Sequence, residues 1–419
     1  MRHVKTTLLF MADSMTFQNA MVFLSVTVVI PYFLNHLGAS AFALSLAPTI
    51  VNIGTILSQP FFARRAMEVS VKHRRFVRYL LIQRVSFFLY ALAIPLLYKA
   101  GAAVSIWAFL AAWCMFNCFT GCYNTFFVAI YTKMVPLSQR GRVMGLGGAA
   151  ANLVAVLTSL LVGVLTREIA FPYNIAAIFL CGILLLLADC AALASLEEPE
   201  DDPPAKASSE SSPAYLKDAL AALGTDERFR KIIIGYTFFA LSCVSLNYCF
   251  MYASRTFSAP ETLVGIFSML TVLGTVAGNL LFGVVADRFG HLSTLILAGA
   301  ASLCGGVFLV LGGSQAAVYC AFTLCTVGNA GYQLSANNYI ALHCPGEKLP
   351  LYVSVHSMVT LTLAAAITLL CGVGFHLLGA KPIFAALTLC AAVSIVITLG
   401  IRKSDRQAPL SPTRDGTLK

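Results

Sequence analysis

Apolar runs of membrane-spanning length follow one another along almost the whole chain, from residue 7 to residue 401. Only 11% of the 419 residues are charged and 58% are hydrophobic, whereas soluble proteins carry about 25% charged residues. The polar residues are therefore too few to cover a soluble protein of this size. The runs do not alternate between apolar and polar residues, which favours helices over the strands of a membrane barrel. The sequence predicts an all-α membrane protein.

Twelve such runs can be separated, and each is long enough to cross the apolar core of a bilayer as a helix. Prolines inside them, such as Pro31 and Pro95, are expected to end or kink the helices. The predicted transmembrane helices cover residues 7–34, 40–62, 79–98, 103–131, 143–166, 170–195, 231–253, 261–286, 294–312, 315–341, 352–378 and 382–401.

A stretch rich in acidic residues, Pro, Ser and Ala at 197–230 divides the predicted helices into six and six. Its composition predicts a solvated linker. Its end, from Pro213 to Arg230, has the apolar spacing of an amphipathic helix. The expected units are an N-terminal six-helix bundle (1–196), this linker, a C-terminal six-helix bundle (231–401) and a tail (402–419).

A short internal repeat indicates that the two bundles are copies of one unit. Gly121-Cys-Tyr-Asn is followed by Pro136, and Gly331-Tyr-Gln is followed by Pro345. The two glycines lie 210 residues apart, which matches one half of a duplicated six-helix unit. We therefore expect two pseudo-symmetric bundles.

Lysine and arginine gather in the connections on one side of the predicted helices. Most of the 28 basic residues share a side with both termini. The opposite side holds Lys99, Arg167, Arg255 and Lys381. Since basic loops stay in the cytoplasm, we expect cytoplasmic termini and a bacterial inner-membrane location. This placement accounts for the net charge of +10 without a nucleic-acid partner. The basic run from Arg64 to Arg78 could also meet anionic lipid headgroups, although its role in topology is a sufficient explanation.

A charged turn joins the second and third predicted helices of the second bundle. It contains Gly283, Asp287, Arg288 and Gly290 in the pattern G-x-x-x-D-R-x-G. This turn resembles the signature loop of the major facilitator superfamily, and the resemblance to that family extends over nearly the whole chain. The resemblance implies that the aspartate caps the next helix and pairs across the domain. It also implies a gate that closes the cytoplasmic side. The corresponding stretch of the first bundle, 58–68, has no aspartate, so the gate is expected to be asymmetric.

Three charged residues lie inside predicted helices: Asp13, Arg84 and Asp189. Counted at about 1.5 Å per residue, each lies roughly 8–10 Å from the cytoplasmic end of its helix. The three could therefore pair if their helices touch. Charges inside the membrane are costly and often functional, which makes Asp13 a candidate for proton coupling. The alternatives are a structural ion pair, or side chains that reach the interface. His356, a few residues into its helix, is a further candidate for proton relay, and a packed histidine is the alternative there.

Uncharged polar and aromatic residues gather in the middle of the first and fourth helix of each predicted bundle. The resemblance implies that these helices line a central cavity. Amides and phenols can bind a polar solute without a permanent charge, and hydrogen bonding between helices is the alternative for each one. The candidate cavity residues are Gln18, Asn19, Asn117, Tyr123, Asn124, Asn247, Tyr248, Tyr332, Gln333 and Asn337.

The resemblance implies a secondary transporter that moves a small organic solute by alternating access, and proton-coupled efflux is the favoured direction. The alternatives are an importer or facilitator of a neutral solute such as a sugar or nucleoside, and a membrane sensor or scaffold that transports nothing. We expect a monomer in the lipid bilayer whose ligands are the solute and protons. The sequence has no P-loop, no metal-ligand spacing and no catalytic cluster, so we expect neither a cofactor nor an enzyme.

Overall fold

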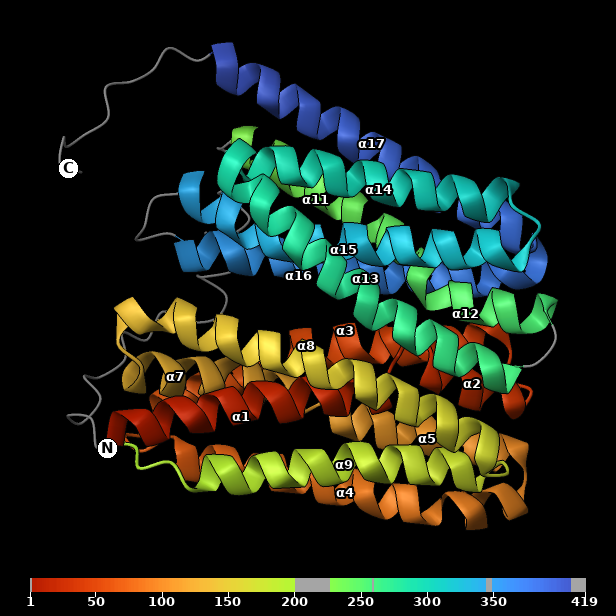
Figure 1. Cartoon of the computed structure of the whole chain (residues 1–419), viewed down its shortest axis with the longest axis horizontal. Helices are drawn as coiled ribbons and strands as arrows, with labels where there is room; N and C mark the ends of the chain where they lie inside the picture. The colour runs from red at the N-terminus through yellow and green to blue at the C-terminus, as the bar shows by residue number, and fades with distance from the viewer. Residues whose placement is uncertain (1, 200–226, 258–259, 344–348, 408–419) are drawn as a thin grey trace.

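The computed structural model describes residues 2–199, 227–257, 260–343 and 349–407, and its regular secondary structure is helical (Figure 1). The first part of the chain forms α1 (Arg2–Phe23), α2 (Val29–His36), α3 (Ala41–Met67), α4 (His73–Ala100), α5 (Ala102–Asn117), α6 (Thr120–Cys122), the π-helix η1 (Tyr123–Phe127), α7 (Val128–Met134), α8 (Leu137–Glu168) and α9 (Tyr173–Ala194). The second part forms α11 (Glu227–Cys243), α12 (Ser245–Thr256), α13 (Pro260–Phe289), α14 (His291–Leu311), α15 (Gln315–His343), α16 (Leu349–Leu377) and α17 (Ala380–Gln407).

Ten of the described helical segments are long and apolar enough to cross a membrane. They correspond to ten of the twelve predicted spans. The other two predicted spans fall on α1 and α15, which are long helices that fail this criterion. Both carry polar residues in mid-helix, such as Asp13 and Gln18 in α1 and Asn329 and Gln333 in α15, and these lower their mean hydropathy. The all-helical membrane architecture is confirmed, while the count of twelve spans stays a prediction.

Three predicted spans are interrupted. The first span breaks after Phe23 and resumes at Val29 as α2, with Pro31 in the first turn of the new helix. Proline is tolerated there because its missing N–H would be unpaired anyway. The fourth span breaks after Asn117 and continues through the π-helix, and the seventh breaks at Val244. Hydropathy does not report where these helices break, because the segments on both sides of each break are apolar.

The helices form two groups, and both termini lie at one end of the molecule (Figure 1). Helices α1 to α9 pack on one another, and so do α11 to α17. The groups meet mainly along two helix pairs, α3 with α16 and α8 with α13. The predicted linker at 197–230, including its amphipathic helix, lies outside the described residues except at its two ends.

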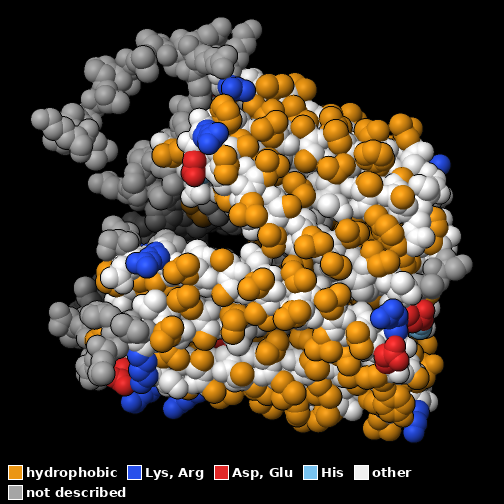
Figure 2. Space-filling view, viewed as in Figure 1, with side chains coloured by type: hydrophobic (Ala, Val, Ile, Leu, Met, Phe, Trp, Pro, Cys, Tyr) orange, Lys and Arg blue, Asp and Glu red, His pale blue; other side chains and the backbone are white. Residues whose placement is uncertain are grey.

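The hydrophobic cores show which end of the molecule is closed. At the end away from the termini, one continuous core joins both groups through Tyr32, Phe250 and Phe267. At the terminus end the described residues form two separate cores, one around Phe76 and Phe126 and the other built on α11, α15 and α16. Figure 2 shows the surface hollowed between the groups on the terminus side. The described arrangement therefore opens toward the termini.

Candidate functional site

An ion pair lies inside the first helix group. The Nη2 atom of Arg84 (α4) is 2.7 Å from Oδ2 of Asp189 (α9). The side chain of Arg84 is 1% exposed and that of Asp189 is fully buried. The guanidinium also donates to the Leu186 carbonyl and to Sγ of Cys190. The structure therefore brings together two of the three charged residues that the sequence singled out.

Asp13 (α1) is the third charged residue, and it joins the same cluster. The hydroxyl of Tyr123 donates to its Oδ2 at 2.9 Å, and Thr16, one turn further along α1, donates to Oδ1 of Asp189 at 3.4 Å. Asp13 is fully buried, and its Oδ1 finds no hydrogen-bond partner among the described residues. The cluster thus holds two carboxyl groups and one guanidinium, which pairs with Asp189. With both ionised, the buried cluster would carry one uncompensated negative charge, which is costly.

The π-helix sets the direction of Tyr123. Residues 121–127 bring α6 and η1 against α3, where Gly121 lies so close that a Cβ atom would be 2.4 Å from the Gln59 nitrogen. The ring of Tyr123 stacks on Phe17 at 4.4 Å and on Phe127 at 5.0 Å. π-Helical turns are rare in proteins, and those that occur are frequently found at functional sites. This turn therefore makes the fourth span a candidate functional element, whether or not the span carries a charge.

The second helix group contains a similar arrangement. The ring of Tyr332 (α15) stacks on Phe239 (α11) at 4.7 Å. Its hydroxyl is 3.0 Å from Nε2 of His356 (α16). Tyr236 packs edge-on against the imidazole. Each group thus has a tyrosine that stacks on a phenylalanine of its first long helix and bonds to a titratable side chain, Asp13 in one group and His356 in the other.

Several predicted cavity residues keep free polar surface. Gln18, Asn124 and Gln333 are exposed, and Asn247 is half-buried. Asn337 lies in α15, but its side chain is outside the described residues. The exposed amides come from α1, η1 and α15, which include the first and fourth spans predicted to face a cavity. Their role as cavity residues stays a prediction.

Three other cavity candidates are buried in this arrangement, and their role in a cavity stays a prediction. Asn19 is 2% exposed and bonds to the carbonyl oxygen of Ala151 and the hydroxyl of Thr158, so it joins α1 to α8. Asn117 bonds to the carbonyl of Trp113 at the end of α5. Tyr248 donates to a carbonyl of α16. All three are buried because they satisfy backbone groups where helices end or cross.

The charged turn differs from what the resemblance implied. Asp287 and Arg288 are exposed and lie within the last turn of α13. Gly290, with φ +79°, makes the turn and precedes α14, which begins without a side-chain cap. Asp287 therefore does not cap the next helix, because it lies three positions before the cap residue Gly290 and its side chain makes no cap hydrogen bond. Its gating role in another arrangement stays a prediction.

A polar seam closes the end away from the termini. Arg255 (α12) donates to Oδ1 of Asn35 (α2) at 3.3 Å and to the carbonyl of Ala39 at 3.2 Å. Beside it, Nε2 of His36 is 3.4 Å from Oε1 of Glu261 (α13). These bonds join the two helix groups. Sequence reasoning placed Arg255 on this side but did not find the seam, because its partners lie more than 200 residues apart.

Two glycines bring α8 and α13 into direct contact near this end. A Cβ atom on Gly163 would lie 3.0 Å from the Cα of Gly265, and the reverse holds. Backbone approach of this kind requires residues without side chains. The seam therefore depends on this glycine pair as well as on polar bonds.

Replacing Gly163 with leucine should force the seam apart. We expect a cost of about 1–3 kcal/mol from overpacking, and a strong loss of solute exchange in proteoliposomes. Gly145→Leu is the matched control, because it lies on the same helix and no atom is within 4 Å of its Cβ position. Equal exchange by the two variants would show that the glycine contact does not control closure.

With this geometry in hand, the chain can be compared with known proteins. The sequence model of the Major Facilitator Superfamily matches residues 12–254 and 232–417. This chain belongs to the Major Facilitator Superfamily. It is an integral membrane protein with a transporter fold, and the predicted family resemblance is confirmed. No curated protein sequence matches the chain.

Solved structures of this superfamily share the fold. The chain is similar to a bacterial homologue of the iron transporter ferroportin in an inward-facing state, with TM-score 0.70, 17% identity and coverage of 95% of this chain and 98% of the other. It is also similar to the nucleoside transporter NupG, with TM-score 0.65, 11% identity and coverage of 97% of this chain and 99% of the other. A third similar structure is the fucose:proton symporter FucP of E. coli, with TM-score 0.61, 14% identity and coverage of 96% of this chain and 99% of the other. Identities this low establish the fold alone.

Proposed function

We propose that this protein is a secondary transporter that moves a small organic solute by alternating access and couples the movement to protons. The observation that carries the coupling is the buried cluster of Asp13, Asp189 and Arg84. A proton on Asp13 removes the uncompensated charge, and its loss restores that charge. A change of protonation can therefore shift the balance between arrangements of the helices around Asp13.

Tyr123 gives the cluster a connection toward the hollow between the helix groups. Its hydroxyl bonds to Asp13, and the residue is only partly buried, while the neighbouring Asn124 is exposed. Tyr332 and His356 supply a second titratable pair in the other group. We propose that a solute held between the groups senses the protonation of Asp13 through Tyr123.

The polar groups that we assign to the cavity are uncharged. Gln18, Asn124 and Gln333 offer amide donors and acceptors, and the tyrosines offer phenols. This set suits a neutral or weakly charged solute. It also supports the second candidate function, an importer or facilitator of a neutral polar solute. The superfamily members NupG and FucP are named for a nucleoside and for fucose, which agrees with that candidate.

We favour cytoplasmic termini in an inner membrane, because the basic residues lie mainly on the terminus side. In that orientation the described arrangement opens inward, so an exported solute could load from the cytoplasm. We propose that one chain suffices, since each half supplies one wall of the site, and that the solute is moved without chemical change.

The test uses purified protein in proteoliposomes. A thermal-shift screen of neutral solutes first identifies a ligand. Uptake of that ligand is then measured under imposed pH gradients of both signs. Coupled efflux predicts accumulation when the direction of the gradient matches proton–solute exchange, and symport predicts the opposite sign. Movement that ignores both gradients would exclude proton coupling and favour the facilitator.

A further inference from the structure

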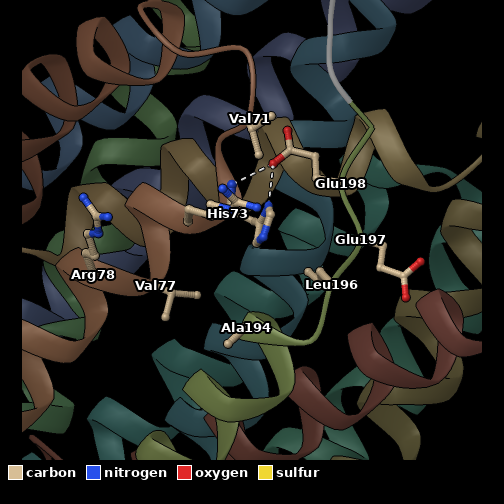
Figure 3. A pocket seen from close by; sticks show the side chains of 9 residues that line it. Val71, His73, Val77, Arg78, Ala194, Leu196, Glu197 and Glu198 are labelled. Carbon is tan, nitrogen blue, oxygen red and sulfur yellow. Dashed lines mark hydrogen bonds and ion pairs between the residues drawn. The ribbon is translucent and has the colours of Figure 1, made fainter.

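A pocket of about 570 Å³ lies in the first helix group, between the start of α4 and the segment that follows α9 (Figure 3). One wall is the start of α4, with His73, Arg74 and Arg78. The other is the segment that follows α9, including Leu196 and Glu198. Neither the charged cluster nor the predicted cavity residues take part in it.

Glu198 fixes the shape of this pocket. Its side chain is fully buried, and its Oε2 accepts a hydrogen bond from the backbone N–H of His73 at 2.7 Å. Its Oε1 lies 2.9 Å from Nζ of Lys133 (α7). The glutamate thus caps the start of α4 from another part of the chain. The sequence predicted a solvated linker from residue 197 onward, and this is wrong at Glu198, because a paired carboxylate can be buried.

The charged residues at the pocket, counted with their ion-pair partners, leave it with a net positive charge. Glu198 is neutralised by Lys133, and Glu197 pairs with Lys5 at 3.2 Å. Arg74 and Arg78 are exposed, and neither guanidinium has an ion-pair partner within the described ranges. Two guanidinium groups one helical turn apart can together bind a phosphate group.

The two arginines lie on the same side of α4 as a stripe of exposed apolar residues, which we take to face the lipid. Large apolar residues that are 40–72% exposed follow Arg78 at spacings of three and four residues along this helix. They are Leu81, Ile82, Val85, Leu89, Leu92 and Leu96. Helices α4 and α9 lie together at the edge of the molecule farthest from α17 (Figure 1). The arginines therefore stand where the apolar stripe ends, at the depth of the lipid headgroups.

We propose that this pocket binds the phosphate headgroup of an anionic glycerophospholipid. Arg74 and Arg78 hold the phosphate, and one acyl chain runs along the apolar stripe of α4. The mixed lining fits such an amphiphile, because Val71, Val77 and Leu196 lie beside the basic groups. A free phosphate shares the headgroup chemistry but makes no use of the stripe. The site is independent of the transported solute.

The test measures phospholipid bound to delipidated full-length protein by native mass spectrometry. The probes are phosphatidylglycerol, phosphatidylcholine and inorganic phosphate. We expect phosphatidylglycerol to be retained in preference to phosphatidylcholine. Because each hydrogen-bonded contact between a guanidinium and the phosphate contributes about fivefold, the variant R74Q/R78Q should bind about 30-fold more weakly.

The matched control is R64Q/R65Q, which removes two exposed arginines at the end of α3, outside the pocket. It should retain phosphatidylglycerol like the original protein, and thermal melting of both variants checks that they fold. Equal loss in both variants, or unchanged binding in R74Q/R78Q, overturns the proposal. Displacement by millimolar inorganic phosphate would assign the pocket to a soluble phosphate instead of a lipid.

Discussion

Replacing Asp13 with asparagine should abolish solute movement driven by a pH gradient. Asparagine has nearly the same shape, and its carbonyl can still accept the hydrogen bond from Tyr123. It cannot bind or release a proton. The net charge of the cluster therefore stays at zero throughout the cycle, with Arg84 neutralised by Asp189. We expect at least a tenfold loss of gradient-driven accumulation, while exchange of solute down its own gradient persists.

Proteoliposomes under imposed pH gradients provide the measurement, with the ligand from the thermal-shift screen as solute. Glu197→Gln is the control, because this carboxylate lies on the same side of the molecule and its side chain is 57% exposed. Its removal should leave gradient-driven accumulation unchanged. If the Asp13 variant accumulates solute as well as the original protein does, Asp13 is not the coupling residue and the cluster is structural.

Replacing Arg84 with methionine should be the most destabilising single change in the first helix group. The guanidinium is 1% exposed and is the cation that pairs with Asp189. Removing one member of a buried pair leaves an uncompensated charge, which costs about 3–5 kcal/mol. We expect a large fall in the yield of folded protein and in its melting temperature.

A second substitution separates this effect from simple loss of packing. Asp189→Leu, added to Arg84→Met, removes both charges and fills similar volume, so most of the stability should return. Melting temperatures in detergent give the comparison between the single and double variants. If the double variant is no more stable than Arg84→Met alone, the cost comes from lost packing, and the ion pair is not what holds α4 against α9.

The charged cluster shows how far the sequence reaches. Asp13, Arg84 and Asp189 were singled out because charges inside apolar helices are costly, and their similar depth would let them pair if their helices touch. The structure confirms this for Arg84 and Asp189 and places Asp13 beside them. Depth along a helix follows from counting residues. The direction of each side chain does not, so the bond from Tyr123 and the unpaired Oδ1 of Asp13 were not predictable.

The amide residues show where sequence reasoning fails. Asn19 and Asn124 are both mid-span amides, yet Asn19 is buried between α1 and α8 while Asn124 is exposed. Which face of a helix points to a neighbour depends on packing and on breaks such as the π-helix at 123–127. Arg255 and Glu198 were likewise assigned to connections between helices. Their contacts could not be predicted, because their partners come from distant parts of the chain.

The sequence by itself determined that this protein is a helical membrane protein, because hydropathy and charge act locally and add along the chain. It also indicated which charged residues inside helices could pair if their helices touch. Only the tertiary structure decided which end is closed, which amides inside the helices are exposed and how Glu198 is buried. These depend on contacts between helices far apart in sequence, whose relative positions no single segment encodes.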